Sequence, residues 1–369
     1  MKITSVKPVL PGRVPLLVRM ETDAGIIGVG ECLSDMGAIG AAAVNELARY
    51  LVGKDPCRIE HHWQAMYRDA FWRGGPVLNA AISGCEQAMW DILGQSVGLP
   101  VYQLLGGACR DRVRMYGHIG GATPDDLARS CEGALKRGLT AVKFTPTEQA
   151  KNLDSPGIVK EAGRKMKATR EVAGDGVDVL VDMHGRLSPA MAILIAEELA
   201  PYRPFFLEEP CLPENVEAMA RVARAVNTPI ATGERLFTKF AFREVLEKQA
   251  AAVLQPDPSA CGGILETKKI AAMAEAYYVS VAPHCPYGAV LLTVCLHLDM
   301  CTPNFLIQEF IHLGEGVLRQ PIEMKDGYCV PTDRPGWGIE VDWEALAART
   351  YQPWDRPIFR HDDGSVADW

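Results

Sequence analysis

The sequence predicts an α/β fold, namely a TIM-type (β/α) barrel modified by an α+β capping domain that the C-terminal segment completes. Two observations carry this prediction. Short apolar runs ending in a polar residue recur about every 26 residues through the middle of the chain, with segments of helical spacing between them. The first part of the chain has a different pattern, in which strand-like segments come first and helical segments follow.

Residues 1–112 are predicted to form the capping domain. Alternating apolar residues predict strands at 3–9, 16–21 and 26–31, and helical spacing predicts helices at about 38–51, 58–67 and 77–93. The glycine-rich stretch at 25–30 lacks the third glycine of a dinucleotide-binding motif and lies between two strand-like runs. We therefore interpret it as a β-hairpin.

Residues 113–322 are predicted to form the barrel. Helical spacing is clear at 190–199, 216–226, 240–249 and 266–277. Eight strands that alternate with helices close into a barrel whose chemistry lies at the carboxyl ends of the strands. The eight strand-like runs are 113–116, 141–144, 179–182, 205–208, 230–234, 254–257, 281–284 and 306–309.

Residues 323–369 lose this repeat and are rich in tryptophan and proline. We expect this segment to return to the capping domain. No low-complexity linker separates the three parts, which favours a capping domain held over the barrel mouth, where it would exclude water.

Composition narrows the classes of function. The chain has 369 residues, 48% of them hydrophobic, and a formal net charge of −8, which argues against nucleic acid or an anionic membrane as a partner. The N-terminus lacks the apolar core of a signal peptide and no apolar run is long enough to span a bilayer, so we expect a cytoplasmic protein. Eleven cysteines without a CxxC pair indicate reduced thiols rather than disulfides or a zinc site.

Three carboxylates predict a metal site. Asp182, Glu208 and Glu234 each end an apolar run, and they are spaced 26 residues apart. A lone acid at a strand end is usually a helix cap or a surface ion pair, but three acids in one register converge on the same end of the barrel. They would repel one another without a cation, and their hard oxygen atoms suit Mg²⁺.

The chain resembles the enolase superfamily and, within it, the sugar-acid dehydratases, closest to the galactonate dehydratases. The resemblance extends over essentially the whole length. The motifs that carry it are residues 21–25, Arg73-Gly74-Gly75-Pro76, Asp182-Met183-His184-Gly185-Arg186, Glu208-Glu209-Pro210, Gly233-Glu234-Arg235, Gln255-Pro256-Asp257 and Ala282-Pro283-His284-Cys285-Pro286.

The resemblance implies a Mg²⁺-dependent hydro-lyase that converts an aldonate into a 2-keto-3-deoxy acid through an enediolate. It implies that the three carboxylates hold Mg²⁺ and that His284, backed by Asp257, and His184 flank the substrate. His284 would remove the proton at C2, and His184 would protonate the departing 3-hydroxyl. Glu309, if protonated, would donate a hydrogen bond to the enediolate. The family commonly assembles, so we expect a homo-oligomer.

Four residues are candidates for substrate binding: Lys143, Thr145, His118 and Arg235. Relatives that racemise often carry a second base where this chain has Thr145, so a racemase or epimerase of the mandelate racemase type, or a lactonising enzyme, is disfavoured. Thr145 and His118 also depart from the galactonate pattern, which leaves the epimer open. A catalytically silent sugar-acid binding protein is the remaining alternative.

Overall fold

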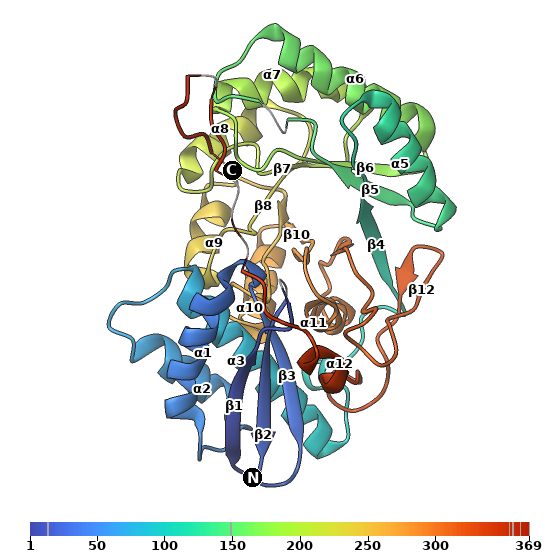
Figure 1. The fold of residues 1–369 in the computed structure, drawn as a ribbon. Helices are drawn as coiled ribbons and strands as arrows, with labels where there is room; N and C mark the ends of the chain where they lie inside the picture. The colour runs from blue at the N-terminus through green and yellow to red at the C-terminus, as the bar shows by residue number, and fades with distance from the viewer. Residues whose placement is uncertain (13–14, 148–149, 354, 356–357, 362, 369) are drawn as a thin grey trace.

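The computed structural model describes residues 1–12, 15–147, 150–353, 355, 358–361 and 363–368 (Figure 1). The predicted barrel with its N-terminal capping domain is confirmed, since a small antiparallel sheet with its helices, in the lower part of Figure 1, packs against a ring of parallel strands. All eleven cysteines are free. Among the described residues, no helix is both long and apolar enough to cross a membrane.

The capping domain begins with the sheet β1-β2-β3, and the turn from β2 to β3 is the hairpin predicted from the glycine-rich stretch. Helix α3 packs along this sheet, and Gly28 and Gly30 allow the close approach because a side chain at either position would overlap the α3 backbone. The elements are β1 (Ile3–Val9), β2 (Leu16–Thr22), β3 (Ile27–Cys32), η1 (Ser34–Met36), α1 (Gly37–Leu51), α2 (Ile59–Arg68), α3 (Pro76–Val97) and α4 (Val101–Leu104).

The barrel consists of eight parallel strands, β4 to β11. Each strand pairs with the next up to β10, β11 pairs with β4, and a bridge between Val281 and Phe305 closes the ring. The strands are β4 (Val113–His118), β5 (Ala141–Phe144), β6 (Asp178–Asp182), β7 (Leu207–Glu208), β8 (Ile230–Thr232), β9 (Val253–Leu254), β10 (Ser280–Val281) and β11 (Gln308–Phe310).

Helices follow the strands from β4 to β10 and cover the outside of the barrel. Several begin at a serine, threonine or asparagine cap, as α5 does at Thr123, because such side chains accept from the exposed N–H groups of the first turn. The helices are α5 (Pro124–Lys136), α6 (Pro156–Ala173), α7 (Pro189–Leu199), η2 (Ala200–Tyr202), α8 (Val216–Ala225), α9 (Thr238–Glu247), α10 (Ile264–Ala276) and α11 (Ala289–Met300).

After β11 the chain forms the hairpin β12 (Met324–Lys325) and β13 (Tyr328–Cys329), which pairs antiparallel with β4. It then returns to the capping domain. There Trp337 donates its indole N–H to the Val29 carbonyl at 2.9 Å, and α12 (Trp343–Ala347) follows. The boundaries expected after residues 112 and 322, between the capping domain, the barrel and the C-terminal segment, stay predictions from the sequence.

Candidate active site

The inner face of the barrel is built in two layers. The lower layer takes one buried residue from each strand or its flank and is apolar apart from a tyrosine hydroxyl: Tyr116, Ala141, Leu180, Phe206, Ala231, Val253, Ala282 and Ile307. Side chains along a strand point alternately to opposite faces, so residues two positions further on face inward again. These are His118, Lys143, Asp182, Glu208, Gly233, Gln255, His284 and Glu309.

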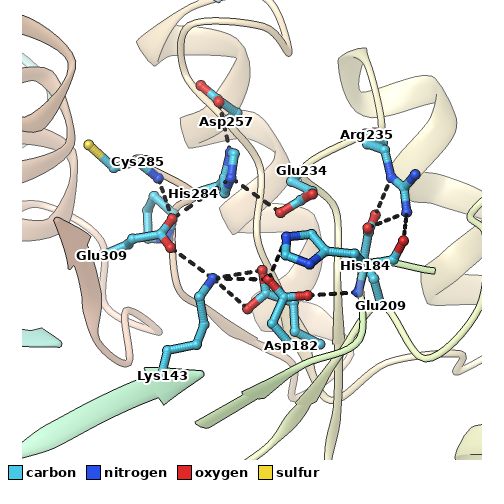
Figure 2. A network of polar contacts seen from close by, with 12 residues as sticks. Lys143, Asp182, His184, Glu209, Glu234, Arg235, Asp257, His284, Cys285 and Glu309 are labelled. Carbon is cyan, nitrogen blue, oxygen red and sulfur yellow. Dashed lines mark hydrogen bonds and ion pairs between the residues drawn. The ribbon is translucent and has the colours of Figure 1, made fainter. Parts of the chain in front are cut away.

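The upper layer therefore contains most of the predicted site, at the carboxyl ends of the strands (Figure 2). Glu234 departs from the register by one residue, and Gly233 explains why. Gly233 has a φ of 142°, and a Cβ atom there would lie 2.8 Å from the Phe242 ring and 2.9 Å from the backbone nitrogen of Gln255. Only glycine fits at this inward position, and the acid comes from the next residue.

Asp182, Glu208 and Glu234 meet as predicted. Each offers an oxygen atom, and the three atoms lie within 4.8 Å of one another. Burial, together with the charge of Glu209, raises the pKa of Glu234 to about 7, because the charged form has lost water and faces other acids. Buried oxygen donors held this close fit a divalent cation, which would remove their repulsion. The three residues can therefore hold a metal ion.

Lys143 is the cation nearest to these acids. Its Nζ atom lies 2.9 Å from both oxygens of Glu208, 2.7 Å from Glu309 and 3.7 Å from Asp182. Burial alone would lower the pKa of Lys143, but Glu208 and Glu309 outweigh burial and raise the pKa well above its usual value. Lys143 is therefore a permanent positive charge inside an acidic cluster, only 2% exposed.

His284 and Asp257 form the predicted pair. His284 Nδ1 lies 2.9 Å from Asp257 Oδ2, and its Nε2 lies 3.2 Å from Glu234. Asp257 is itself held by Ser259, whose N–H and Oγ–H donate to Oδ1 at 2.7 and 2.6 Å. Burial would lower the pKa of His284, but Glu234, Glu309 and Asp257 together raise it to about 10. The arrangement strongly favours a proton on this imidazole.

Glu309 differs from the sequence-based prediction. It accepts from the Cys285 backbone N–H at 2.8 Å, and His118 Nε2 lies 2.7 Å from its other oxygen. Burial would raise the pKa of Glu309, but Lys143, His284 and His118 hold the pKa well below its usual value. The expected protonated Glu309 is therefore not favoured in this arrangement, because the positive charges of Lys143 and His284 stabilise its carboxylate form.

His184 lies beyond the end of β6, with a φ of 49°. Its backbone N–H donates to Asp182 Oδ1 at 2.9 Å, and its Nε2 lies 3.1 Å from Asp182 Oδ2. Burial lowers the pKa of His184 to about 4. Figure 2 shows both His184 and His284 beside the carboxylate cluster, and the two residues come from the segments that follow β6 and β10.

Arg235 binds protein groups in this structure. Its guanidinium donates to both oxygens of Glu209, at 3.1 and 2.5 Å, and to the His184 carbonyl at 3.0 Å. This ties the end of β8 to the turn that carries His184. Thr145 directly follows β5 and is partly exposed, two residues after Lys143 in the chain.

Sequence reasoning missed two residues of the site. Glu209 is fully buried and anchors Arg235, and only its position beside Glu208 hinted at a role. Gln255 is fully buried in the upper layer, and neither its amide oxygen nor its amide nitrogen has a hydrogen-bond partner in the described structure. Burying such an amide unpaired is costly, so Gln255 is suited to bind a ligand or a water molecule. Its inward register on β9 was the available signal.

The comparisons with known proteins agree with this geometry. The family model "Enolase C-terminal domain-like" matches residues 126–345, and the model "Mandelate racemase / muconate lactonizing enzyme, N-terminal domain" matches residues 11–106. The chain belongs to the enolase superfamily. This membership confirms the family that the sequence motifs indicated.

Curated members of the superfamily align along the whole chain. The D-galactonate dehydratase of Cronobacter sakazakii is 42% identical, with 100% of both chains covered. The D-galactonate dehydratase of Xanthomonas euvesicatoria is 43% identical, with 96% of both chains covered. These relatives are dehydratases by name, and their similarity confirms the predicted enzyme class, a hydro-lyase.

Solved structures of the superfamily share the fold. An enolase superfamily member from Salmonella Typhimurium superposes with a TM-score of 0.90 at 31% identity, covering 95% of this chain and 98% of that chain. A mandelate racemase/muconate lactonizing enzyme-like protein from Roseovarius sp. TM1035 gives a TM-score of 0.88 at 36% identity, covering 95% and 96%. The capping domain and barrel are thus common to this chain and its relatives.

Proposed function

We propose that this enzyme dehydrates an aldonate, with D-galactonate as the first candidate, to a 2-keto-3-deoxy acid in a Mg²⁺-dependent reaction. The observation that carries the proposal is the grouping of the His284–Asp257 pair, His184 and three metal-suited carboxylates around one barrel mouth. The names of the curated relatives support the same substrate class.

The difficulty of the reaction lies in removing a proton beside a carboxylate, because this places a second negative charge next to the first. Asp182, Glu208 and Glu234 would hold Mg²⁺, which when bound would offset that charge on the substrate. Lys143, a permanent cation beside the same carboxylates, would add to this stabilisation.

His284 is our candidate for the base. It would take the proton from C2 on its Nε2 atom, while Asp257 holds Nδ1 and thereby fixes the ring and its tautomer. In the ligand-free arrangement the pKa of His284 is raised to about 10, largely by Glu234 and Glu309. A cation bound by Glu234 would reduce that influence and favour the neutral imidazole that a base requires.

His184 would supply the second proton, a role that requires the bound substrate to raise the pKa of His184 above the value of about 4 that burial gives it in the ligand-free arrangement. As the electron pair left at C2 forms the C2–C3 double bond, the C3–O bond breaks and the hydroxyl leaves as water with a proton from His184. The resulting enol then tautomerises to the 2-keto-3-deoxy acid. Arg235 would act indirectly, because its bond to the His184 carbonyl fixes the turn that presents this group.

The test is a panel of five- and six-carbon aldonates, incubated with the purified protein and Mg²⁺, with and without EDTA, and assayed for 2-keto-3-deoxy acids. We expect EDTA-sensitive product from D-galactonate or from one of its epimers. Absence of product from every aldonate would overturn the proposal. Deuterium exchange at C2 without product would point instead to a racemase or epimerase.

Thr145 is the feature that disfavours that second candidate. A racemase of this family needs bases on both faces of the substrate carbon, and a threonine at this position cannot accept the proton. The homo-oligomeric assembly and the cytoplasmic location expected from the sequence stay predictions.

A further inference from the structure

We propose that two buried carboxylates of the capping domain, Glu31 and Glu86, position the His284–Asp257 pair from outside the barrel. Each carboxylate binds the first turn of a barrel helix that follows one member of the pair. They are positioning residues, since neither reaches the pair directly. This inference rests on the proposed function in one respect, which is that His284 is the base.

Glu31 fixes the segment that follows His284. It lies near the end of β3 and is fully buried. Its two oxygens accept from the backbone N–H groups of Gly288, at 2.8 Å, and Leu291, at 3.0 Å, which begin α11. A Cβ atom on Gly288 would lie 2.4 Å from a Glu31 carboxylate oxygen, so the glycine allows the carboxylate to come this close to the backbone. Only three residues separate His284 from Gly288.

Glu86 does the same for the segment that follows Asp257. It lies on α3, is fully buried, and accepts from the N–H groups of Ile264, at 2.9 Å, and Leu265, at 3.0 Å, in the first turn of α10. The indole N–H of Trp90 donates to it at 2.8 Å. Gly263 again allows this close approach, because a Cβ atom at this position would lie 2.1 Å from a Glu86 carboxylate oxygen.

The loop between Asp257 and α10 receives further bonds from the capping domain. Gln87 donates to the Pro258 carbonyl at 2.9 Å, and the Leu33 N–H donates to the Ser259 carbonyl at 3.1 Å. Ser259 in turn donates twice to Asp257, which holds His284. A continuous series of hydrogen bonds thus joins the capping domain to the base.

Both sites use the same physical principle. The first N–H groups of a helix have no partner within the helix, and they carry partial positive charge. A buried carboxylate that satisfies two of them fixes where the helix begins in three dimensions. Since His284 and Asp257 lie in irregular segments after the short strands β10 and β9, these fixed helix starts limit how far the pair can move.

The experiment compares Glu31→Gln and Glu86→Gln with Asp91→Asn as the matched control. Asp91 is also a buried capping-domain carboxylate that accepts two backbone N–H groups, but its partners are Val29, at 3.0 Å, and Trp337, at 2.9 Å, away from the pair. Each glutamine keeps the size of the side chain and offers one acceptor oxygen in place of two. Steady-state kinetics, Mg²⁺ titration and thermal melting are measured on all three.

We expect kcat to fall about ten- to a hundredfold in Glu31→Gln and Glu86→Gln, as for a misplaced catalytic group, with KM and the Mg²⁺ midpoint little changed. Asp91→Asn should lose thermal stability while keeping kcat. Equal kcat in all variants, or a loss that simply follows melting temperature, would overturn the inference. If Glu31→Gln does not fold, Glu86→Gln still tests the positioning role of the capping-domain carboxylates.

A second measurement separates this inference from the proposed function. The ring ¹⁵N signals of His284, assigned with a His284→Asn variant of histidine-labelled protein, report its hydrogen bond to Asp257 whether or not the protein is active. We expect these signals to shift in Glu31→Gln and to stay in place in Asp91→Asn. Unshifted signals in both glutamine variants would refute the positioning role even if the wild type dehydrates aldonates. An inactive wild type with shifted signals would refute only the function.

Discussion

The Nζ atom of Lys143 lies 2.9 Å from both carboxylate oxygens of Glu208. This buried pair joins the only lysine of the upper layer to one of the three acids suited to a metal ion. Lys143 thus partly neutralises the cluster before any cation binds, and the two cations would share the same acid.

Replacing Lys143 with methionine should therefore make the protein more dependent on Mg²⁺. Removing one partner of a buried ion pair costs about 3 to 5 kcal/mol of unfolding free energy when the other charge is left alone. Bound Mg²⁺ would restore much of that loss, because it neutralises the same acids. Thermal melting with and without Mg²⁺ measures this, and we expect a larger Mg²⁺-induced increase in Tm for Lys143→Met than for the wild type.

Lys239→Met is the matched control for that measurement. Lys239 also pairs with a buried acid, Glu266, at 3.0 Å, but it lies on α9 outside the acid cluster. Its replacement should lower Tm without changing the Mg²⁺ increment. Equal increments in both lysine variants would contradict the assigned electrostatic coupling.

Replacing His284 with asparagine should abolish turnover while leaving Mg²⁺ binding nearly intact. A positioned base contributes about 10²- to 10⁴-fold to the rate, and asparagine cannot accept the C2 proton. His284 approaches Glu234 at 3.2 Å but is not itself one of the three acids. Turnover assays and Mg²⁺ titration by calorimetry test this. Loss of Mg²⁺ binding in the variant would remove His284 from the role of base.

Replacing Glu208 with glutamine should weaken Mg²⁺ binding directly. The amide keeps the shape but loses the negative charge that a hard cation prefers, so we expect at least about a tenfold loss of affinity. The same titration as for His284→Asn provides the comparison. An unchanged binding curve would show that Glu208 is not a Mg²⁺ ligand and that its main role is the ion pair with Lys143.

The burial of His297 should make the stability of the protein depend on pH. It is fully buried, with Nδ1 3.2 Å from the Tyr102 backbone nitrogen and Nε2 3.2 Å from the Trp337 carbonyl oxygen, and burial lowers its pKa from 6.5 to about 4. The unfolded chain therefore binds this proton more readily than the folded protein between those two values. The contribution of neutral His297 to the free energy of unfolding is fully present above pH 6.5. It decreases by roughly 3 kcal/mol as the pH drops toward 4.

Denaturant unfolding at several pH values measures this effect. His297→Gln removes the titrating group, so its unfolding free energy should fall less steeply between pH 6.5 and pH 4 than that of the wild type. The exposed His61→Gln should keep the wild-type slope. Identical slopes in all three proteins would mean that His297 does not contribute.

The barrel and the acid triad were predictable because both depend on a repeat along the chain. The spacing of Asp182, Glu208 and Glu234 equals the length of one strand-helix unit. Each acid therefore lies at the same end of its strand, which predicts that the three meet at one end of the barrel. The ionisation of Glu309 could not be predicted in this way. It depends on Lys143 and His118, which approach Glu309 only after the ring of strands closes.

The role of the capping domain was equally hidden. Glu31 and Gly288 lie 257 positions apart, and a single acid after a strand is ordinary in any sequence. Their contact depends on how the capping domain packs against the segments that follow β9 and β10, which no local pattern specifies. Gln255 is intermediate, since its place in the register was visible, but the sequence could not show that its side-chain amide has no hydrogen-bond partner among the described residues.

The nearly all-apolar lower layer of the barrel has a consequence for how such an enzyme can change. Its side chains are buried and packed together, while most of the residues two positions above them carry charges or polar groups that face one another. A substitution in the upper layer, such as one at His118, is therefore expected to change the polar surface at the barrel mouth with little effect on the packed layer below. New specificities can arise from this scaffold by exchange of a few rim residues, with the folding of the protein left largely undisturbed.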